Sequence, residues 1–228
     1  MSLPFGLTPT QGVLAASAGF AALYQLQVRS QPSVPRCIVK TASTGLLSAL
    51  AALRGAPTLL SSALALGATG DAFLAFDGDN AFLSGLTSFL TAHVLYIKLL
   101  SDTHPAGSVA AQLGLLGAGG WRTYAAGAVA LSVSGMIAQL MPKVKKELRA
   151  PVVVYSLTIA AMSLLALTAE NAKVTVGALL FTASDAILSA DKFLVHPQSR
   201  WRGLMQHAVW VLYYSGQLLI TLGFGRDE

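Results

Sequence analysis

Residues 174–195 read VTVGALLFTASDAILSADKFLV. This mostly apolar run is long enough to cross the hydrocarbon core of a bilayer, which takes roughly 20 helical residues. It nevertheless contains Asp185 and Asp191, although a carboxylate at membrane depth is costly. A closely similar heptapeptide, DAFLAFD, occupies residues 71–77, also in an apolar setting. We therefore expect a helical membrane protein whose intramembrane aspartates are retained for chemistry.

The composition is that of an integral membrane protein. Of the 228 residues, 54% are hydrophobic and 11% are charged, against roughly 45–50% and 25% in soluble domains. Spanning segments must satisfy their own backbone, and the alternating pattern of a barrel is missing, so we expect helices. The predicted fold is an all-α, polytopic membrane helical bundle of about eight transmembrane helices, in one integral membrane domain over residues 1–228. The predicted spans are residues 10–28, 37–53, 58–76, 81–100, 121–141, 151–170, 174–195 and 203–224.

Residues 107–120 are also apolar, but this stretch is short and rich in glycine. We expect an interfacial or re-entrant segment that joins the fourth and fifth spans. Near the N-terminus, the first basic residue, Arg29, follows the first apolar run instead of preceding it. A cleavable signal peptide is therefore not predicted, and the first span is expected to remain as an anchor.

The basic residues are distributed unevenly between the two predicted sides of the membrane, with ten on one side and five on the other. Because cytoplasmic loops carry the excess of Lys and Arg, we expect the loops after the first, third, fifth and seventh spans in the cytoplasm, and both termini outside or in the lumen. The cations form no stripe on a soluble domain, so no nucleic-acid partner is expected. The ten are Arg29, Arg36, Lys40, Lys143, Lys145, Lys146, Arg149, Lys192, Arg200 and Arg202, and the five are Arg54, Lys98, Arg122, Lys173 and Arg226.

The two aspartate heptapeptides suggest an internal repeat. Asp71 lies in the third predicted span and Asp185 in the seventh, so duplication of a four-helix unit would produce two parallel repeats. The tripeptide Val-Leu-Tyr also recurs, in the fourth and eighth spans. Chance similarity between apolar helices is the alternative explanation. The two repeats would cover residues 10–100 and 121–224.

Polar side chains are predicted to converge on the half of the bundle nearer the more basic side. With a rise of 1.5 Å per residue, Asp71 lies about 8 Å from that end of its span, and Asp185 lies near the midplane. We therefore expect a pocket that opens toward the basic side. Its other polar residues would be Lys40, Tyr155 and Asp191 near the opening, with His93 and Tyr213 as a floor.

Four segments stand out along the chain, namely GDAFL from Gly70, FLTAHVLY from Phe89, GALLFTASD from Gly177 followed by DKF from Asp191, and YYSGQLLIT from Tyr213. In their order and spacing they resemble the YhhN-type lysoplasmalogenase family. This resemblance spans residues 40–222 and implies a multi-pass membrane enzyme that hydrolyses the vinyl ether bond of lysoplasmenylethanolamine or lysoplasmenylcholine. The products would be a fatty aldehyde and glycerophosphoethanolamine or glycerophosphocholine. The protein would act on a lysophospholipid among membrane lipids, in an endomembrane such as the endoplasmic reticulum if eukaryotic or the inner membrane if bacterial.

The chemistry of vinyl ether hydrolysis gives a separate reason to single out two aspartates. The β-carbon is protonated in the slow step, and water captures the resulting oxocarbenium ion to form a hemiacetal, which collapses to aldehyde and alcohol. This requires one protonated acid and one ionised carboxylate. Burial favours a neutral carboxyl group, and two carboxylates that share a site cannot easily both ionise. We therefore expect Asp71 and Asp185 to be the catalytic pair, with either one as the acid, and we expect no metal or organic cofactor.

Lys40 and Asp191 are weaker candidates for substrate binding or support. Lys40 could bind a lipid phosphate or neutralise a carboxylate, but a lysine at the end of a span also commonly extends to the headgroups. Asp191 lies about 120° from Asp185 around an ideal helix, so it need not face the same cavity. Lys192, Lys40 and Arg200 are its expected ionic partners.

The remaining candidates are aromatic or amide side chains. His93 is either a polar wall of the pocket or a histidine satisfied by a neighbouring helix. Four further side chains could donate hydrogen bonds to the carboxylates or the headgroup, namely Tyr155, Tyr213, Tyr214 and Gln217. Tyrosines are, however, also common near membrane interfaces.

Two other classes of function remain open. A proton- or ion-coupled small-molecule transporter would also keep aspartates inside the membrane. A metal-dependent membrane lipid hydrolase would need histidines clustered from several helices, and only His93 is clearly intramembrane. The single cysteine, Cys37, has no companions at the spacing of metal ligands.

Overall fold

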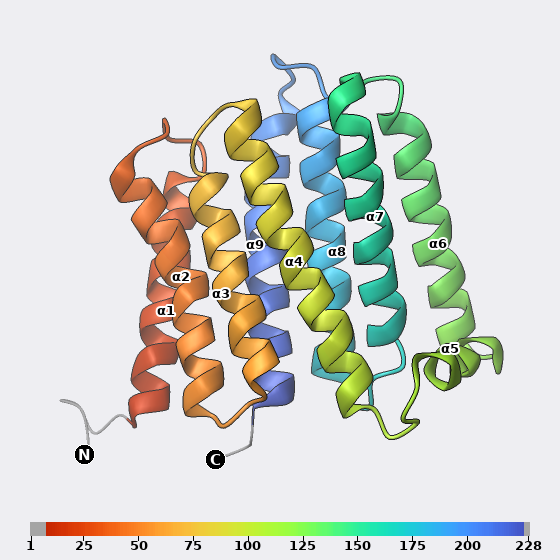
Figure 1. Cartoon of the computed structure of the whole chain (residues 1–228). Coiled ribbons are helices and arrows are strands. Elements are labelled where there is room, and N and C mark those ends of the chain that lie inside the picture. The colour runs from red at the N-terminus through yellow and green to blue at the C-terminus, as the bar shows by residue number, and fades with distance from the viewer. Residues whose placement is uncertain (1–7, 226–228) are drawn as a thin grey trace.

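The computed structural model describes residues 8–225, and this part of the chain forms nine α-helices and no strand (Figure 1). Arg226, one of the five cations assigned above to the less basic side, lies outside the described residues. The helices are α1 (Pro9–Gln27), α2 (Val34–Leu53), α3 (Thr58–Phe73), α4 (Asp79–Thr103), α5 (Val109–Gly117), α6 (Trp121–Leu140), α7 (Lys146–Ala166), α8 (Ala172–Phe193) and α9 (Trp201–Phe224).

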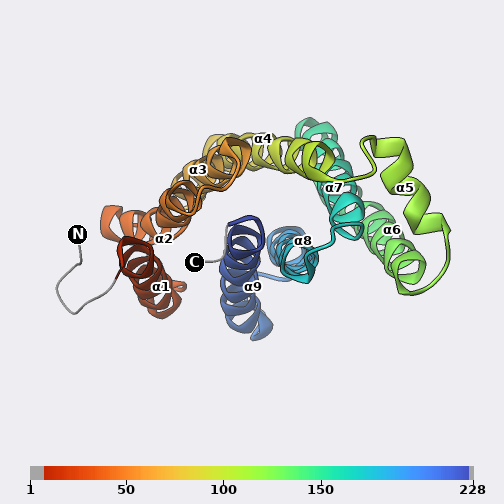
Figure 2. The same cartoon turned by 90° about the horizontal axis from the view of Figure 1, so that it is seen from below.

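Eight of these helices coincide with the eight predicted stretches, and α5 falls within residues 107–120. With nine residues, α5 is only about 14 Å long, too short to cross a hydrocarbon core of about 30 Å. It lies across the end of α6 (Figures 1 and 2). By length and composition, five of the described helices could cross a membrane, namely α2, α4, α6, α7 and α8. The all-helical fold is confirmed, whereas the number of eight transmembrane helices is not.

The start of α7 differs from its prediction. The sequence predicts that the sixth span begins at Pro151, but the helix begins at Lys146 and contains Pro151. Glu147 lies in the first turn, where a negative charge interacts favourably with the helix dipole. The preceding loop is held by Arg149, whose Nε donates a hydrogen bond of 3.2 Å to the carbonyl oxygen of Val144. The basic segment is therefore partly helical.

The helices form a curved row with two helices packed on its concave side (Figure 2). Helices α1, α2, α3 and α4 follow one another along the row, whereas α8 and α9 pack together inside it. The two four-helix units thus do not follow the same path, and the predicted repeat is not confirmed. The loops α1–α2, α3–α4, α6–α7 and α8–α9 all lie at one end of the bundle (Figure 1). That end carries the loops with the larger number of cations.

Glycine allows the closest helix contact, which joins α8 to α9. A Cβ atom built on Gly177 would lie 2.7 Å from the carbonyl oxygen of Gly216, and one built on Gly216 would lie equally close to the oxygen of Gly177. Small residues at membrane helix interfaces permit this approach of two backbones. The surrounding interior is closely packed and apolar, while large apolar side chains cover the outside, including Leu26 and Leu131. An apolar exterior suits a protein surrounded by lipid.

Candidate active site

A cavity of about 770 Å³ opens at the end of the bundle that carries the α1–α2 and α3–α4 loops. Its walls come from both halves of the chain. The cavity brings together six of the nine side chains singled out from the sequence: Lys40, Asp71, Tyr155, Asp185, Asp191 and Tyr213.

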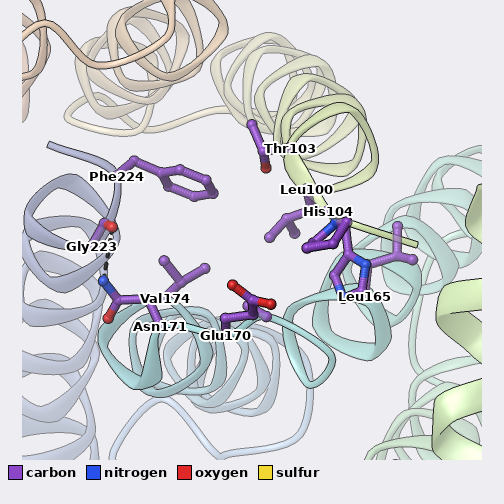
Figure 3. Close-up of a pocket in the computed structure, with 11 residues that line it drawn as sticks. Leu100, Thr103, His104, Leu165, Glu170, Asn171, Val174, Gly223 and Phe224 are labelled. Carbon is purple, nitrogen blue, oxygen red and sulfur yellow. Dashed lines mark hydrogen bonds between the residues drawn. The ribbon is translucent and has the colours of Figure 1, made fainter. Parts of the chain in front are cut away.

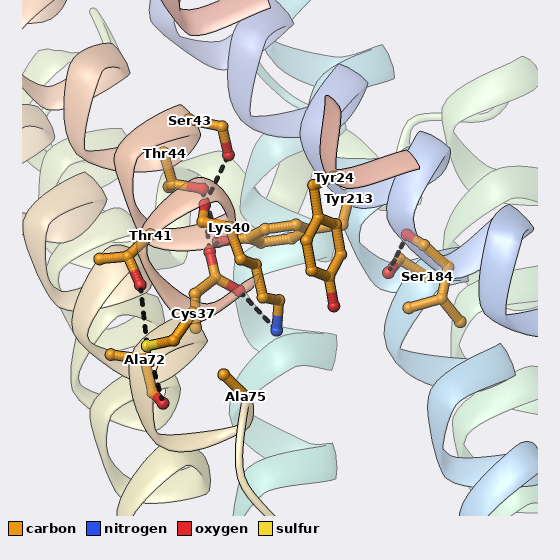
Figure 4. Close-up of polar contacts among 12 residues, drawn as sticks. Tyr24, Cys37, Lys40, Thr41, Ser43, Thr44, Ala72, Ala75, Ser184 and Tyr213 are labelled. Carbon is orange, nitrogen blue, oxygen red and sulfur yellow. Dashed lines mark hydrogen bonds and ion pairs between the residues drawn. The ribbon is translucent and has the colours of Figure 1, made fainter. Parts of the chain in front are cut away.

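Asp71 is buried and accepts three polar contacts. Lys40 Nζ lies 3.1 Å from its Oδ1, while the hydroxyl groups of Thr44 and Tyr213 donate to Oδ2 over 2.9 and 2.8 Å. Figure 4 shows Lys40, Thr44 and Tyr213 converging from α2 and α9. An ionised carboxylate accepts hydrogen bonds and donates none, and hydrogen bonds to charged groups are the stronger ones. The surroundings of Asp71 are therefore those of a carboxylate fixed in one orientation.

Thr44 is a contact of Asp71 that the sequence patterns above do not single out, although a signal is present. It lies four residues after Lys40 on α2, so both side chains lie on the same face of that helix. Tyr24 was also missed, and its ring centroid lies 5.8 Å from Lys40 Nζ. The helical spacing between Lys40 and Thr44 indicates Thr44, whereas Tyr24 lies on α1 and has no such signal in the sequence.

Asp185 has a simpler environment. The hydroxyl of Tyr155 donates a hydrogen bond to its Oδ2, and no other described side chain shares a hydrogen bond or an ion pair with this carboxyl group. Tyr155 comes from α7 and Asp185 from α8. The second oxygen of Asp185 is thus left for a substrate or for water. The two aspartates line one cavity but differ in the number and charge of their partners.

The expectation that Asp191 pairs with Lys192, Lys40 or Arg200 was wrong, because its ionic partner is Arg202. Arg202 forms two bonds to it, from Nε to Oδ1 at 2.8 Å and from Nη2 to Oδ2 at 3.2 Å. Gln206 adds a longer contact of 3.4 Å. Arg202 and Gln206 lie one turn apart on α9, which packs directly against α8. Lys192 instead places its ammonium group 4.2 Å from the centroid of the Phe82 ring.

Three predicted site residues do not line the cavity, and the expectation that His93 forms its floor was wrong. His93 is fully buried, and its Nδ1 lies 2.6 Å from the carbonyl oxygen of Phe89. Its ring packs against Tyr155, with 5.3 Å between centroids. Tyr214 shares a hydrogen bond of 2.8 Å with Ser17. The side-chain oxygen of Gln217 accepts a hydrogen bond of 2.5 Å from the hydroxyl of Tyr96. His93, Tyr214 and Gln217 therefore lie behind the residues that line the cavity.

Arg36 lines the cavity and forms hydrogen bonds to the ends of two helices, and the sequence did not indicate this role. Its guanidinium donates to the carbonyl oxygens of Gln27 and Val28 at the end of α1 and of Ala75 after α3, over 3.1, 3.1 and 3.2 Å. It also donates to the hydroxyl of Tyr24 at 3.0 Å. Carbonyl groups at helix C-termini lack partners within the helix. Arg36 therefore joins the ends of α1 and α3 beside the cavity opening.

A second, smaller cavity of about 220 Å³ lies near the opposite end of the bundle. It is lined mainly by apolar residues, with the carboxyl group of Glu170 directed into it (Figure 3). None of the predicted site residues lines it. Within residues 8–225, no three His, Cys, Asp or Glu side chains gather in a group that could hold a metal ion.

Comparisons with known proteins give a consistent result. The family model described as "YhhN family" matches residues 35–224. Proteins named lysoplasmalogenase from Mycobacterium bovis and Mycobacterium tuberculosis are each 32% identical over 171 residues, which is 72% of this chain and 60% of the relative. The protein named lysoplasmalogenase TMEM86B from Homo sapiens is 31% identical over 195 residues, 84% of this chain and 74% of the relative. The chain thus spans about 60% of the length of the mycobacterial relatives. No solved structure matches it significantly.

Proposed function

The chain belongs to the YhhN family, and from that premise we propose that it hydrolyses the vinyl ether bond of lysoplasmalogens. The products are a fatty aldehyde and glycerophosphoethanolamine or glycerophosphocholine. The observation that carries the proposal is that Asp71 and Asp185 line one cavity in different surroundings. The names of the relatives support the same activity.

We assign the two carboxyl groups different roles. Three donors, one of them cationic, hold Asp71 as the ionised carboxylate. Asp185, with one hydroxyl partner and a free oxygen, is the proton donor. Pairs of carboxyl groups whose environments favour different protonation states commonly divide acid and base roles in this way. Lys40, Thr44 and Tyr213 position Asp71, while Tyr155 positions Asp185.

The reaction then follows from these roles. Asp185 transfers its proton to the β-carbon of the vinyl ether, which leaves an oxocarbenium ion on the ether side. The negative charge of Asp71 stabilises this cation and orients a water molecule toward it. Water adds to the cationic carbon and gives up a proton to a carboxylate. The hemiacetal collapses when the glycerol oxygen takes back the proton that Asp71 received from water and the hemiacetal hydroxyl gives its own proton to Asp185, which releases the aldehyde and restores both carboxyl groups.

The membrane arrangement forms part of the proposal. Residues 1–228 form one integral membrane domain in which eight helices cross the bilayer and α5 lies at its surface. The loops α1–α2, α3–α4, α6–α7 and α8–α9 face the cytoplasm, because ten of the 15 Lys and Arg residues lie in these loops or in the nearby turns of the helices that flank them. The cavity then opens toward the cytoplasmic headgroups, within reach of lysophospholipid. The membrane is an endomembrane such as the endoplasmic reticulum in a eukaryote, or the inner membrane in a bacterium.

The decisive experiment measures aldehyde release by the detergent-purified protein. The substrates are a lysoplasmalogen, its saturated ether analogue and an ester lysophospholipid. We expect aldehyde from the vinyl ether only, because protonation of carbon requires the double bond. Cleavage of the ester at a comparable rate would contradict the mechanism. Uptake of small solutes into proteoliposomes without any aldehyde would favour a transporter instead.

A further inference from the structure

The cavity is lined by more cations than carboxyl groups. Four of these charged groups form two ion pairs, Lys40 with Asp71 and Arg202 with Asp191, and the two charges of each pair compensate each other. The remaining charged groups of the lining are Arg29, Arg36 and Lys192 against Asp77 and Asp185. The wall therefore keeps a net positive charge even when both of these aspartates are ionised.

Arg29 and Lys192 are the cations that remain available to a ligand. The donors of Arg36 are already used by three carbonyl groups and by Tyr24. Across residues 8–225, no side-chain hydrogen bond or salt bridge engages Arg29 or Lys192. Both side chains are exposed and line the cavity.

Both side chains lie at the opening of the cavity. Arg29 follows the end of α1, and its Nη1 would lie 3.2 Å from a Cβ atom built on Gly203 at the start of α9. Lys192 lies in the last turn of α8, with its ammonium group 4.2 Å from the centroid of the Phe82 ring. The absence of a side chain at Gly203 leaves room for the guanidinium, and the ring supports the ammonium. The two cations are thus anchored near the loops.

We propose that Arg29 and Lys192 form a phosphodiester-binding subsite that receives the headgroup phosphate of the lysophospholipid. This inference rests on the proposed function. When the vinyl ether lies between Asp71 and Asp185, only the glycerol unit separates it from the phosphate, which then lies toward the opening. Arg and Lys are the side chains that bind phosphate oxygens. Asp77 lines the same cavity and supplies a carboxylate for the ammonium group of an ethanolamine headgroup.

The test compares two vinyl ether substrates that differ only in the phosphate-containing headgroup. Lysoplasmenylethanolamine carries the phosphodiester, and 1-O-alkenylglycerol lacks it. In the full-length double variant R29Q/K192Q we expect KM for the phospholipid to rise at least about tenfold, with kcat within about twofold. KM for the alkenylglycerol should not change. The matched control is Arg200→Gln, a cation of the same end of the bundle that packs on Trp201 and does not line the cavity.

Two results would overturn the subsite. One is an equal rise in KM for both substrates, and the other is an equal rise in the Arg200→Gln control, which would indicate attraction by the surface as a whole. Failure of the proposed function gives a different result, since the wild-type protein would then release no aldehyde from either substrate. In that case, equilibrium binding of the saturated ether lysophospholipid replaces kinetics. The subsite requires that R29Q/K192Q weaken this binding at least about tenfold and leave binding of the saturated alkylglycerol unchanged.

Discussion

The hydroxyl of Tyr213 donates a hydrogen bond of 2.8 Å to Oδ2 of Asp71, and so joins α9 to a carboxylate on α3. The ring of Tyr213 is held by aromatic neighbours, with centroids 5.7 Å from Phe89 and 5.3 Å from Phe181. Two segments separated by 142 positions are thereby brought into one site. The orientation of the carboxylate consequently depends on the packing of the whole bundle.

Tyr213→Phe should lower kcat about tenfold, because it removes one hydrogen bond to a charged group but keeps the ring. Tyr214→Phe is the matched control, since Tyr214 bonds to Ser17 and does not line the cavity. We expect wild-type kcat from this control. Kinetics of aldehyde release would compare the two, and equal losses of activity would contradict the placement of Asp71 next to Tyr213.

Replacement of either aspartate by asparagine should lower the rate of aldehyde release at least about a hundredfold, because each aspartate acts as an acid or a base in the proposed reaction. Asp71→Asn and Asp185→Asn are the variants, with Asp102→Asn as control. Asp102 pairs with Lys98 on an exposed part of α4, far from the cavity lining. Aldehyde release would be measured on protein whose folding has been checked by thermal unfolding. Activity retained in Asp185→Asn would exclude it as the proton donor.

Lys40→Met should destabilise the protein by about 3–5 kcal/mol, because it leaves the carboxylate of Asp71 buried without its ionic partner. The double variant K40M/D71N removes the uncompensated charge and should recover much of this stability while remaining inactive. Thermal unfolding in detergent and the aldehyde assay together separate the two effects. If the single and double variants were equally unstable, the ion pair would have no structural role.

The reaction should be slower in D₂O than in H₂O under saturating substrate. This follows because the proposed slow step transfers a proton from an exchangeable carboxyl group to carbon. The deuterium from the solvent should also appear in the aldehyde, on the carbon next to the carbonyl group. Mass spectrometry of the product checks this directly, and product without deuterium would rule out protonation of the β-carbon.

Gly177→Leu and Gly216→Leu should prevent the close packing of α8 against α9, with losses of at least about 1–3 kcal/mol or failure to fold. A Cβ atom at either position already meets the backbone of the other helix. Gly135→Leu on α6 is the control, because a Cβ atom there has no neighbour within 4 Å. Thermal unfolding would show whether the two classes of glycine differ as expected.

The helices were predictable because apolar run length and local backbone satisfaction decide them. The limits of α3, α6 and α9 lie within a few residues of their predicted values. The predicted span that corresponds to α7 begins five residues too late, at Pro151, whereas the helix begins at Lys146 and contains this proline. The partner of Asp191 could not be predicted either, because Lys192 and Arg200 both lie nearer to it along the chain than Arg202 does. Only the contact between α8 and α9 selects Arg202.

The sequence by itself determined that the chain forms apolar helices and that Asp71 and Asp185 stand out within them, because these properties follow from local composition. The tertiary structure decided which side chains meet these aspartates. Lys40 and Thr44 come from α2, Tyr213 from α9 and Tyr155 from α7, and spacing along the sequence does not say which of these helices face the aspartates. It also decided that His93 and Gln217 lie away from the cavity, since helix rotation and the close approach at the glycines set the direction of each side chain.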